Sequence, residues 1–243
     1  MALSEWKVDP LGDQALSITF GTTIDPATNE RAIRFCRALT AHPFPGLIEA
    51  VPAYHTATVF FDAVEVGRSL RPAGPEGGPS IADVVSGHCR RVWRMVADAD
   101  GDQPDKPRLF RIPVVYGGER GPDLAEVAEA CRLEVEDVIR LHASVEYRVY
   151  LTGFLPGFPY MGTLPKELAI DRKPVPRLVV PPGSVAIAGD QTGIYPLASP
   201  GGWRVIGQTP VVLFDPRRHP PGRLRAGDRV RFVPIPERDW ERY

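Results

Sequence analysis

Two segments in the second half of the chain combine glycine, proline and aromatic residues with no regular period. The first is GFLPGFPYMG, from Gly153 to Gly162, and the second is VPPGSVAIAGDQTGIYPLASPGGW, from Val180 to Trp203. Proline fixes the backbone φ angle and removes an N–H donor, whereas glycine allows positive φ and close backbone approach. We therefore expect stiff turns that carry rigid aromatic faces and suit the wall of a ligand or partner surface.

Short apolar runs separated by glycine and proline turns follow Tyr147. This pattern predicts a compact β-barrel or β-sandwich. The strands are expected at 147–151, 178–180, 185–188, 203–207, 211–214 and 229–233. Before them, the sequence predicts a strand at 109–115 and two short helices at 123–130 and 135–143, with Pro122 at the first helical position of the first.

The first hundred residues mix strand and helix patterns. Strands are expected at 15–20 and 58–61, one helix after Asp25 and Pro26, and an amphipathic helix over about 81–96. The polar segment 98–107 is typical of a hinge. The expected fold class is therefore α+β, with a small α+β N-terminal lobe over residues 1–105 and a β-barrel lobe over residues 106–243.

Composition and charge limit the classes of function. The chain has 243 residues, of which 43% are hydrophobic, so it can bury a real core. Its net charge of -1 argues against nucleic-acid binding, because nucleic-acid modules carry a basic excess. The three cysteines lack a CxxC pair and are expected to be reduced. No signal peptide or membrane-spanning apolar run is found, so we expect no membrane partner and a cytoplasmic location.

Motif searches exclude several common sites. The chain has neither a P-loop nor a GxGxxG phosphate cradle. HExxH is absent and the five histidines show no ligand spacing, so no metal site is expected. Ser184 lacks a nucleophile elbow and a His-Asp partner pattern, which favours a turn serine over a hydrolase nucleophile.

His142 is the candidate catalytic residue. It ends the second expected helix, just before the glycine-rich segment. An imidazole with a pKa near neutrality could protonate or orient a substrate oxygen. The alternative is a helix-end histidine bonded to backbone carbonyls.

Candidate binding residues come from the two glycine-rich segments and the basic residues near them. The aromatic rings could fill the barrel core, or together they could form an apolar pocket with a few orienting polar groups. The substrate-binding candidates are Phe154, Pro156, Gly157, Tyr160, Gln191, Thr192, Tyr195 and Trp203. The anion-binding candidates, which could equally lie in solvated loops, are Arg172, Arg177 and Arg204.

Several of these motifs resemble one family. GFLPGFPYMG, PPGSVAIAG, QTGIYPLASPGGW and IGQTP are similar to signatures of the family of 5-oxoprolinase B subunits. The same family covers the sporulation kinase A inhibitor and the first half of the carboxyltransferase-type domain of allophanate hydrolase and urea amidolyase. GDQAL, VPAY and IPVVYGG extend the resemblance over nearly the whole chain, although 68–107 matches weakly and Asp171 and Pro182 depart from the pattern. The resemblance implies a cyclophilin-like barrel, and His142 resembles the histidine before the family's YxV strand.

The resemblance also implies a function. The chain would be the B subunit of an ATP-dependent 5-oxoprolinase, inactive alone, that works with a homologous C subunit and with an A subunit to convert 5-oxo-L-proline into L-glutamate. ATP and Mg²⁺ would bind in the assembled complex, with no covalent cofactor. Because no P-loop is encoded, ATP would bind at the interface with the C subunit or on the partner. Two alternatives stay open: inhibition of a sensor histidine kinase, and the carboxyltransferase half of an allophanate hydrolase or urea amidolyase system.

Overall fold

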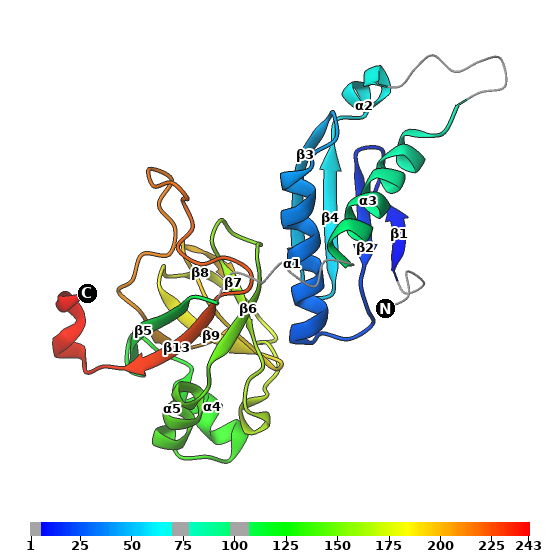
Figure 1. The fold of residues 1–243 in the computed structure, drawn as a ribbon. Coiled ribbons are helices and arrows are strands. Elements are labelled where there is room, and N and C mark those ends of the chain that lie inside the picture. The colour runs from blue at the N-terminus through cyan, green and yellow to red at the C-terminus, as the bar shows by residue number, and fades with distance from the viewer. Residues whose placement is uncertain (1–5, 70–77, 98–106) are drawn as a thin grey trace. The chain divides into compact units, whose positions relative to one another are not determined.

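The chain forms two compact units, Met1–Lys106 and Pro107–Tyr243. The structure, a computed structural model, describes residues 6–69, 78–97 and 107–243. Apart from Pro107, the expected hinge lies outside the described residues. Each unit has a hydrophobic core of its own. Figure 1 shows the helices and strands of the two units.

The first unit is an antiparallel sheet with helices packed on it. The sheet order is β1-β2-β4-β3, and α1 packs against β3, β4 and α3 (Figure 1). The elements are β1 (Lys7–Pro10), β2 (Ala15–Thr19), α1 (Pro26–Ala41), β3 (Leu47–Ala53), β4 (Thr56–Phe61), α2 (Ala63–Ser69) and α3 (Ile81–Ala97).

Helix α1 begins where the sequence predicts. The Asp25 carboxylate accepts hydrogen bonds from the backbone N–H groups of Ala27 and Thr28, each at 2.9 Å. Pro26 starts the helix, where its missing N–H costs no intrahelical bond. The buried face of α1, which includes Leu39, then packs into the core of this unit.

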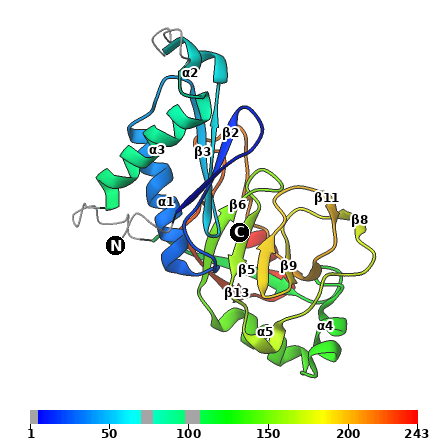
Figure 2. The same cartoon turned by 90° about the vertical axis from the view of Figure 1, so that its right-hand side faces the viewer.

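The second unit is built around a closed barrel of seven strands. The strand order is β10-β7-β6-β13-β5-β12-β9, and all neighbours are antiparallel except the parallel pair β13 and β5 (Figure 2). The elements are β5 (Leu109–Tyr116), α4 (Leu124–Cys131), α5 (Val135–Ser144), β6 (Tyr147–Thr152), β7 (Pro159–Gly162), η2 (Lys166–Leu168), β8 (Arg177–Val180), β9 (Ser184–Ala188), β10 (Gln191–Ile194), β11 (Ser199–Gly201), β12 (Arg204–Gln208), β13 (Arg229–Pro234) and η3 (Glu237–Arg242). The prediction of an α+β chain with a barrel lobe is confirmed.

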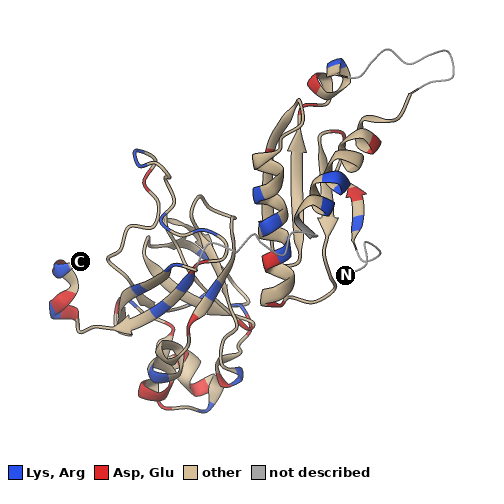
Figure 3. Ribbon diagram, viewed as in Figure 1, with Lys and Arg blue, Asp and Glu red and all other residues tan. Residues whose placement is uncertain are grey.

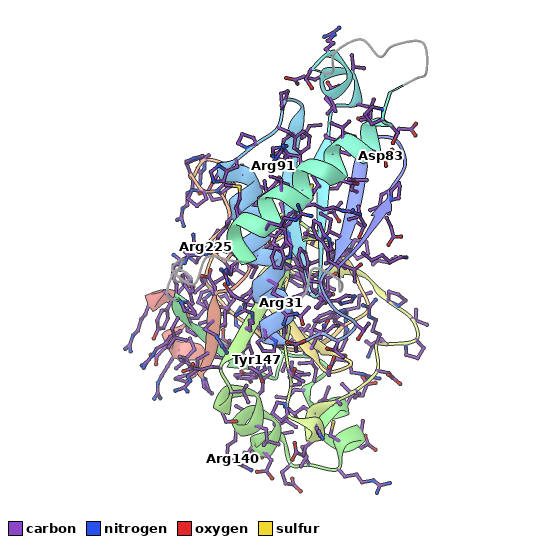
Figure 4. The ribbon with its side chains drawn as sticks, turned by 45° about the vertical axis from the view of Figure 1, so that its right-hand side comes forward. Arg31, Asp83, Arg91, Arg140, Tyr147 and Arg225 are labelled. Atoms are coloured by element: carbon purple, nitrogen blue, oxygen red, sulfur yellow. The ribbon has the colours of Figure 1, made fainter. Side chains whose placement is uncertain are left out.

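Helix α5 packs one face against the barrel and leaves the other in solvent. Val138 and His142 are buried, whereas Arg140 lies on the outer face and pairs with Asp137 at 2.8 Å. Tyr147, at the start of β6, donates its hydroxyl proton to the carbonyl oxygen of His142 at 2.9 Å. Figure 4 shows Tyr147 within the barrel and Arg140 at the outer edge of the unit.

One expected strand is wrong. Residues 211–214 do not join the barrel; only Phe214 forms an isolated bridge, with Gly222. Pro210 and Pro216 flank this run, and proline cannot donate to a strand ladder, so the pairing does not extend. The structure also contains elements outside the expected set, namely β1, β3, α2, β7, η2, β10, β11 and η3.

Candidate functional site

The two glycine- and proline-rich segments pack against each other. They form an aromatic cluster of Phe158, Tyr160, Tyr195 and Trp203. The Phe158 ring stands nearly perpendicular to those of Tyr195 and Trp203, with centroids 5.1 and 5.6 Å apart. The segments therefore meet in a packed cluster instead of facing each other across a cleft.

Two glycines allow this packing. A Cβ atom on Gly193 would lie 2.7 Å from the Phe158 ring, and one on Gly201 would lie 2.4 Å from the Tyr195 hydroxyl oxygen. Both separations are too short for a side chain at these positions. The glycines of β10 and β11 thus bring the backbone close to the rings.

Phe154 contacts the aromatic cluster and is exposed at the surface. Its φ angle is +66°, in the left-handed region that aromatic residues rarely adopt, and its side chain is 63% exposed. The ring packs edge-on against Phe158 at 5.8 Å. Pro156 and Gly157 complete the turn, and a Cβ atom on Gly157 would lie 3.0 Å from Phe214. An exposed aromatic residue on strained backbone is a feature of binding turns.

Gln191 lies on the same side of strand β10 as this cluster. It is half-buried and pairs in register with Gly162 of β7, while Gly193, two residues further on, faces the Phe158 ring. Residues two apart on a strand share a face. The structure therefore places Gln191 beside the aromatic cluster.

Arg172 is the one anion-binding candidate that stays available. Its guanidinium carbon lies 5.9 Å from the centroid of the Trp203 ring, and the side chain is exposed. Within the ranges that the structure covers, it forms no ion pair with a carboxylate. Burial raises the pKa of Tyr160, and the charge of Arg172 opposes this rise. A guanidinium beside a phenol and aromatic rings can bind a small planar carboxylate.

The other two candidate arginines are already paired. Arg177 donates to both oxygens of Asp123, at 2.6 and 2.7 Å. Arg204 pairs with Glu126 and donates to the carbonyl oxygen of Asp171 at 2.9 Å. Their charge is neutralised within the unit, so they fasten segments together and are not free to bind an anion. The carboxylates lie 54 and 78 positions away along the chain, which hides the pairing from a sequence motif.

Asp123 is the centre of this network. Its side chain is 2% exposed and also accepts hydrogen bonds from Lys173 at 3.0 Å and from the backbone N–H of Val205 at 2.7 Å. Burial raises the pKa of Asp123, but the hydrogen bonds from Arg177 and Lys173 outweigh it and hold the pKa below its ordinary value. Figure 3 shows acidic and basic residues interspersed along the helices of this unit. The sequence patterns did not single out Asp123.

His142 lies inside the unit with both ring nitrogens bonded. Its Nδ1 is 2.7 Å from the Tyr116 hydroxyl, and its Nε2 is 2.9 Å from the Thr192 hydroxyl. Thr192 donates its own proton to the carbonyl oxygen of Ala186 at 3.1 Å, so it accepts from Nε2–H, and Nδ1 accepts from Tyr116. The imidazole also stacks on Phe232, with centroids 4.5 Å apart. These contacts define a neutral tautomer.

This environment does not suit a group that meets substrate. Burial lowers the pKa of His142 from 6.5 to about 3, so the ring is uncharged near neutral pH. Both His142 and Thr192 are fully buried. They join α5 to the barrel wall, and neither reaches a surface from which a substrate could approach. The partners of His142 are side chains, not the backbone carbonyls of the alternative interpretation.

The described part of the chain holds no group of three or more histidine, cysteine, aspartate or glutamate side chains placed to bind a metal ion. Cys36, Cys89 and Cys131 are free thiols. Within the same residues, no helix has the length and apolar character needed to cross a membrane.

Comparison with known sequences places the chain. The profile of the family described as "Carboxyltransferase domain, subdomain C and D" matches residues 6–224. The chain belongs to this family. A relative from Bacillus subtilis (strain 168), named as the B subunit of 5-oxoprolinase, is 44% identical over 238 residues, which cover 98% of this chain and 96% of the relative. The resemblance to the family of 5-oxoprolinase B subunits is thereby confirmed.

Solved structures of other proteins share the fold. The crystal structure of TTHA0988 aligns with a TM-score of 0.74 at 38% identity, covering 92% of this chain and 40% of that chain. This chain therefore spans less than half the length of TTHA0988. The Kluyveromyces lactis urea carboxylase also aligns with a TM-score of 0.74, at 18% identity over 97% of this chain and 22% of that chain, and so shows the same fold.

Proposed function

We propose that this chain is the B subunit of an ATP-dependent 5-oxoprolinase, which converts 5-oxo-L-proline into L-glutamate. The observation that carries the proposal is the 44% identity to the Bacillus subtilis 5-oxoprolinase B subunit over nearly the full length of both chains. The chain would act with a homologous C subunit and with an A subunit, and would be inactive alone.

The chemistry gives ATP a reason to take part. An unactivated amide hydrolyses slowly, and transfer of a phosphoryl group to the lactam oxygen would make its carbonyl carbon a better electrophile. The protein would position the reactants and stabilise the developing charge. Because the described residues hold no acidic cluster for a metal ion, Mg²⁺ would arrive with the nucleotide phosphates. The nucleotide would then bind at the interface with the partner or on the partner.

The surface around the aromatic cluster would supply the contacts that 5-oxoproline needs. The ligand has one carboxylate and a flat lactam ring. Arg172 would pair with the carboxylate, because it is exposed and unpaired with any described carboxylate. Tyr160 and Phe154 would contact the ring, and Gln191 lies on the same side of the barrel sheet.

The test is a kinetic assay of the assembled complex. The chain is co-expressed with the C and A subunits, and ADP and glutamate are measured as 5-oxoproline is added. In Arg172→Gln, we expect the KM for 5-oxoproline to rise about 10-fold or more, since a charge-assisted hydrogen bond contributes about 1.5–3 kcal/mol. Arg140→Gln is the matched control, because Arg140 is exposed on α5 and pairs only locally with Asp137.

The outcomes separate the site from the function. A complex that hydrolyses no ATP in response to 5-oxoproline would contradict the proposed function. Normal kinetics in Arg172→Gln, in a complex shown to be active and fully assembled, would instead remove Arg172 from the site.

A further inference from the structure

A short arm on the barrel unit exposes apolar side chains. This β8 arm, residues 174–180, includes strand β8 and the loop before it. Val175, Leu178 and Val179 are 78%, 87% and 64% exposed. Among the described strands, β8 pairs only with β11, in a two-stranded sheet that is separate from the barrel (Figure 2).

The charged side chains of the arm turn toward its own unit. Arg177 donates to both oxygens of Asp123, and Lys173, just before the arm, contacts Asp123 and Glu126. The exposed large side chains of the arm are therefore apolar, and its one charged side chain, Arg177, is paired within the unit. Exposed strand edges in monomeric proteins are usually blunted with charged residues, and contiguous exposed apolar residues mark interaction sites. A two-stranded sheet alone is also only marginally stable, so a covering partner would stabilise it.

The sequence of the arm indicates how it is covered. Strand β8 is four residues long, and Pro176 and Pro181 flank it directly. Proline cannot donate to a ladder, so an added strand could not extend past either end. This discourages edge-to-edge pairing of two copies of the chain. A partner can still bind the arm through the apolar side chains. This mode of contact suits a partner that presents an apolar surface of its own.

We propose that the β8 arm is the surface through which this chain binds another polypeptide of its enzyme, namely the C subunit. This inference rests on the proposed function. The full-length relative is named as one subunit of an enzyme, and the TTHA0988 chain continues well beyond the part that this chain matches, so related barrels occur within larger polypeptides. A different polypeptide is therefore the expected occupant.

The arm borders the candidate binding surface. The backbone N–H of Lys173 donates to the carbonyl oxygen of Gly202 at 2.8 Å, and a Cβ atom on Gly202 would lie 3.7 Å from Pro176. Gly202 precedes Trp203, over which Arg172 lies. A partner bound to the arm would thus lie next to Arg172 and shield that side of the surface from water.

The experiment measures assembly separately from catalysis. The tagged C subunit is titrated with the full-length chain, and binding is followed by analytical ultracentrifugation. In the double variant Leu178→Asp, Val179→Lys, we expect the Kd to rise at least 100-fold. Both side chains are exposed, so circular dichroism and the thermal midpoint should stay close to those of the wild type. Val212→Asp is the matched control, since Val212 is 57% exposed on another part of the same unit, and its Kd should not change.

Each outcome decides the inference. An unchanged Kd in the double variant would overturn it, as would the absence of any complex with wild-type chain. Self-association of the chain alone that the double variant abolishes would overturn it in favour of a second copy. A complex that depends on the arm but shows no 5-oxoproline-dependent ATP hydrolysis would support the arm and contradict the proposed function instead.

Discussion

The imidazole of His142 shows how burial decides what a residue can do. A histidine in water changes its charge near pH 6.5, but this one exchanges water for the hydroxyls of Tyr116 and Thr192 and the ring of Phe232. Protonation would add a second N–H donor where Tyr116 already donates. Burial and the hydrogen bond from Tyr116 both disfavour the protonated imidazole. The neutral side chain therefore connects α5 to strands β5 and β10 through hydrogen bonds.

This burial predicts a specific pH dependence of stability. The folded pKa of about 3 lies below the unfolded value of 6.5, so below pH 6.5 the unfolded state binds the proton more readily. The wild-type chain should lose stability on this account as the pH falls from 6.5 toward 3, by on the order of 2 kcal/mol between pH 7 and pH 4.5. His142→Gln has no imidazole at this position and therefore lacks this pH-dependent loss of stability. Urea denaturation should show it about 1–3 kcal/mol less stable at pH 8, with the gap narrowing or reversing at pH 4.5.

Tyr116→Phe provides the control for this effect. It removes the hydroxyl bonded to Nδ1 but keeps the imidazole buried, so its stability should fall with pH as in the wild type. A constant gap between wild type and His142→Gln across the whole range would show that the imidazole titrates normally and is open to water.

At the scale of single residues, the sequence could predict which side chains carry useful chemical groups, but not which side chains those groups contact in the fold. The aromatic residues of the glycine-rich segments do come together, because proline and glycine restrict those segments locally and the restriction is visible in the sequence. The partners of Arg177 and His142 are far away along the chain, and only the barrel closure brings them near. Local sequence patterns therefore predicted Arg177 and His142 to be free for anion binding and catalysis.

At the scale of elements, periodicity predicted the longer helices and several barrel strands well but missed other short elements. Helix α1 begins where it was expected, and α3, α4 and α5 begin and end close to their expected positions, since each has a clear buried stripe. Strands such as β7 and β10 are four residues long and contain glycine or proline, so no alternation is visible. Conversely, the apolar run at 211–214 has strand composition, but the neighbouring prolines prevent a ladder.

The network around Asp123 links helix α4 to strands β8 and β12, and we expect it to dominate the stability of these three elements. Asp123→Asn would leave Arg177 and Lys173 short of a partner next to a buried site, and we expect a loss of about 3 kcal/mol in the free energy of unfolding. Glu126→Gln is the control, because Glu126 is half exposed and its pairs with Lys173 and Arg204 are screened by water. Its loss should stay below about 1 kcal/mol. Equal losses in the two variants, measured by urea denaturation, would rule out a central role for Asp123.

At the scale of the whole molecule, the chain is organised as two units with separate cores. The core around Leu39 draws only on residues of the first unit, and the cores around Phe232 and Trp203 draw only on the second. The seven barrel strands of the second unit close on themselves, so each barrel strand has a neighbour on both sides. The β8 arm is an exposed apolar surface of the second unit, and we assign it to a partner.

Separate cores predict that each unit folds alone. We expect the fragments 1–106 and 107–243 each to unfold in one cooperative transition in urea, because units of this size bury enough apolar surface to be stable. Tryptophan fluorescence reports on both, since Trp6 and Trp93 lie in the first fragment and Trp203 and Trp240 in the second. Asp123→Asn should lower the midpoint of the second fragment by the same amount as in the full-length chain. A second fragment that shows no cooperative transition, or an Asp123→Asn effect that disappears in it, would mean that the barrel depends on the first unit for its stability.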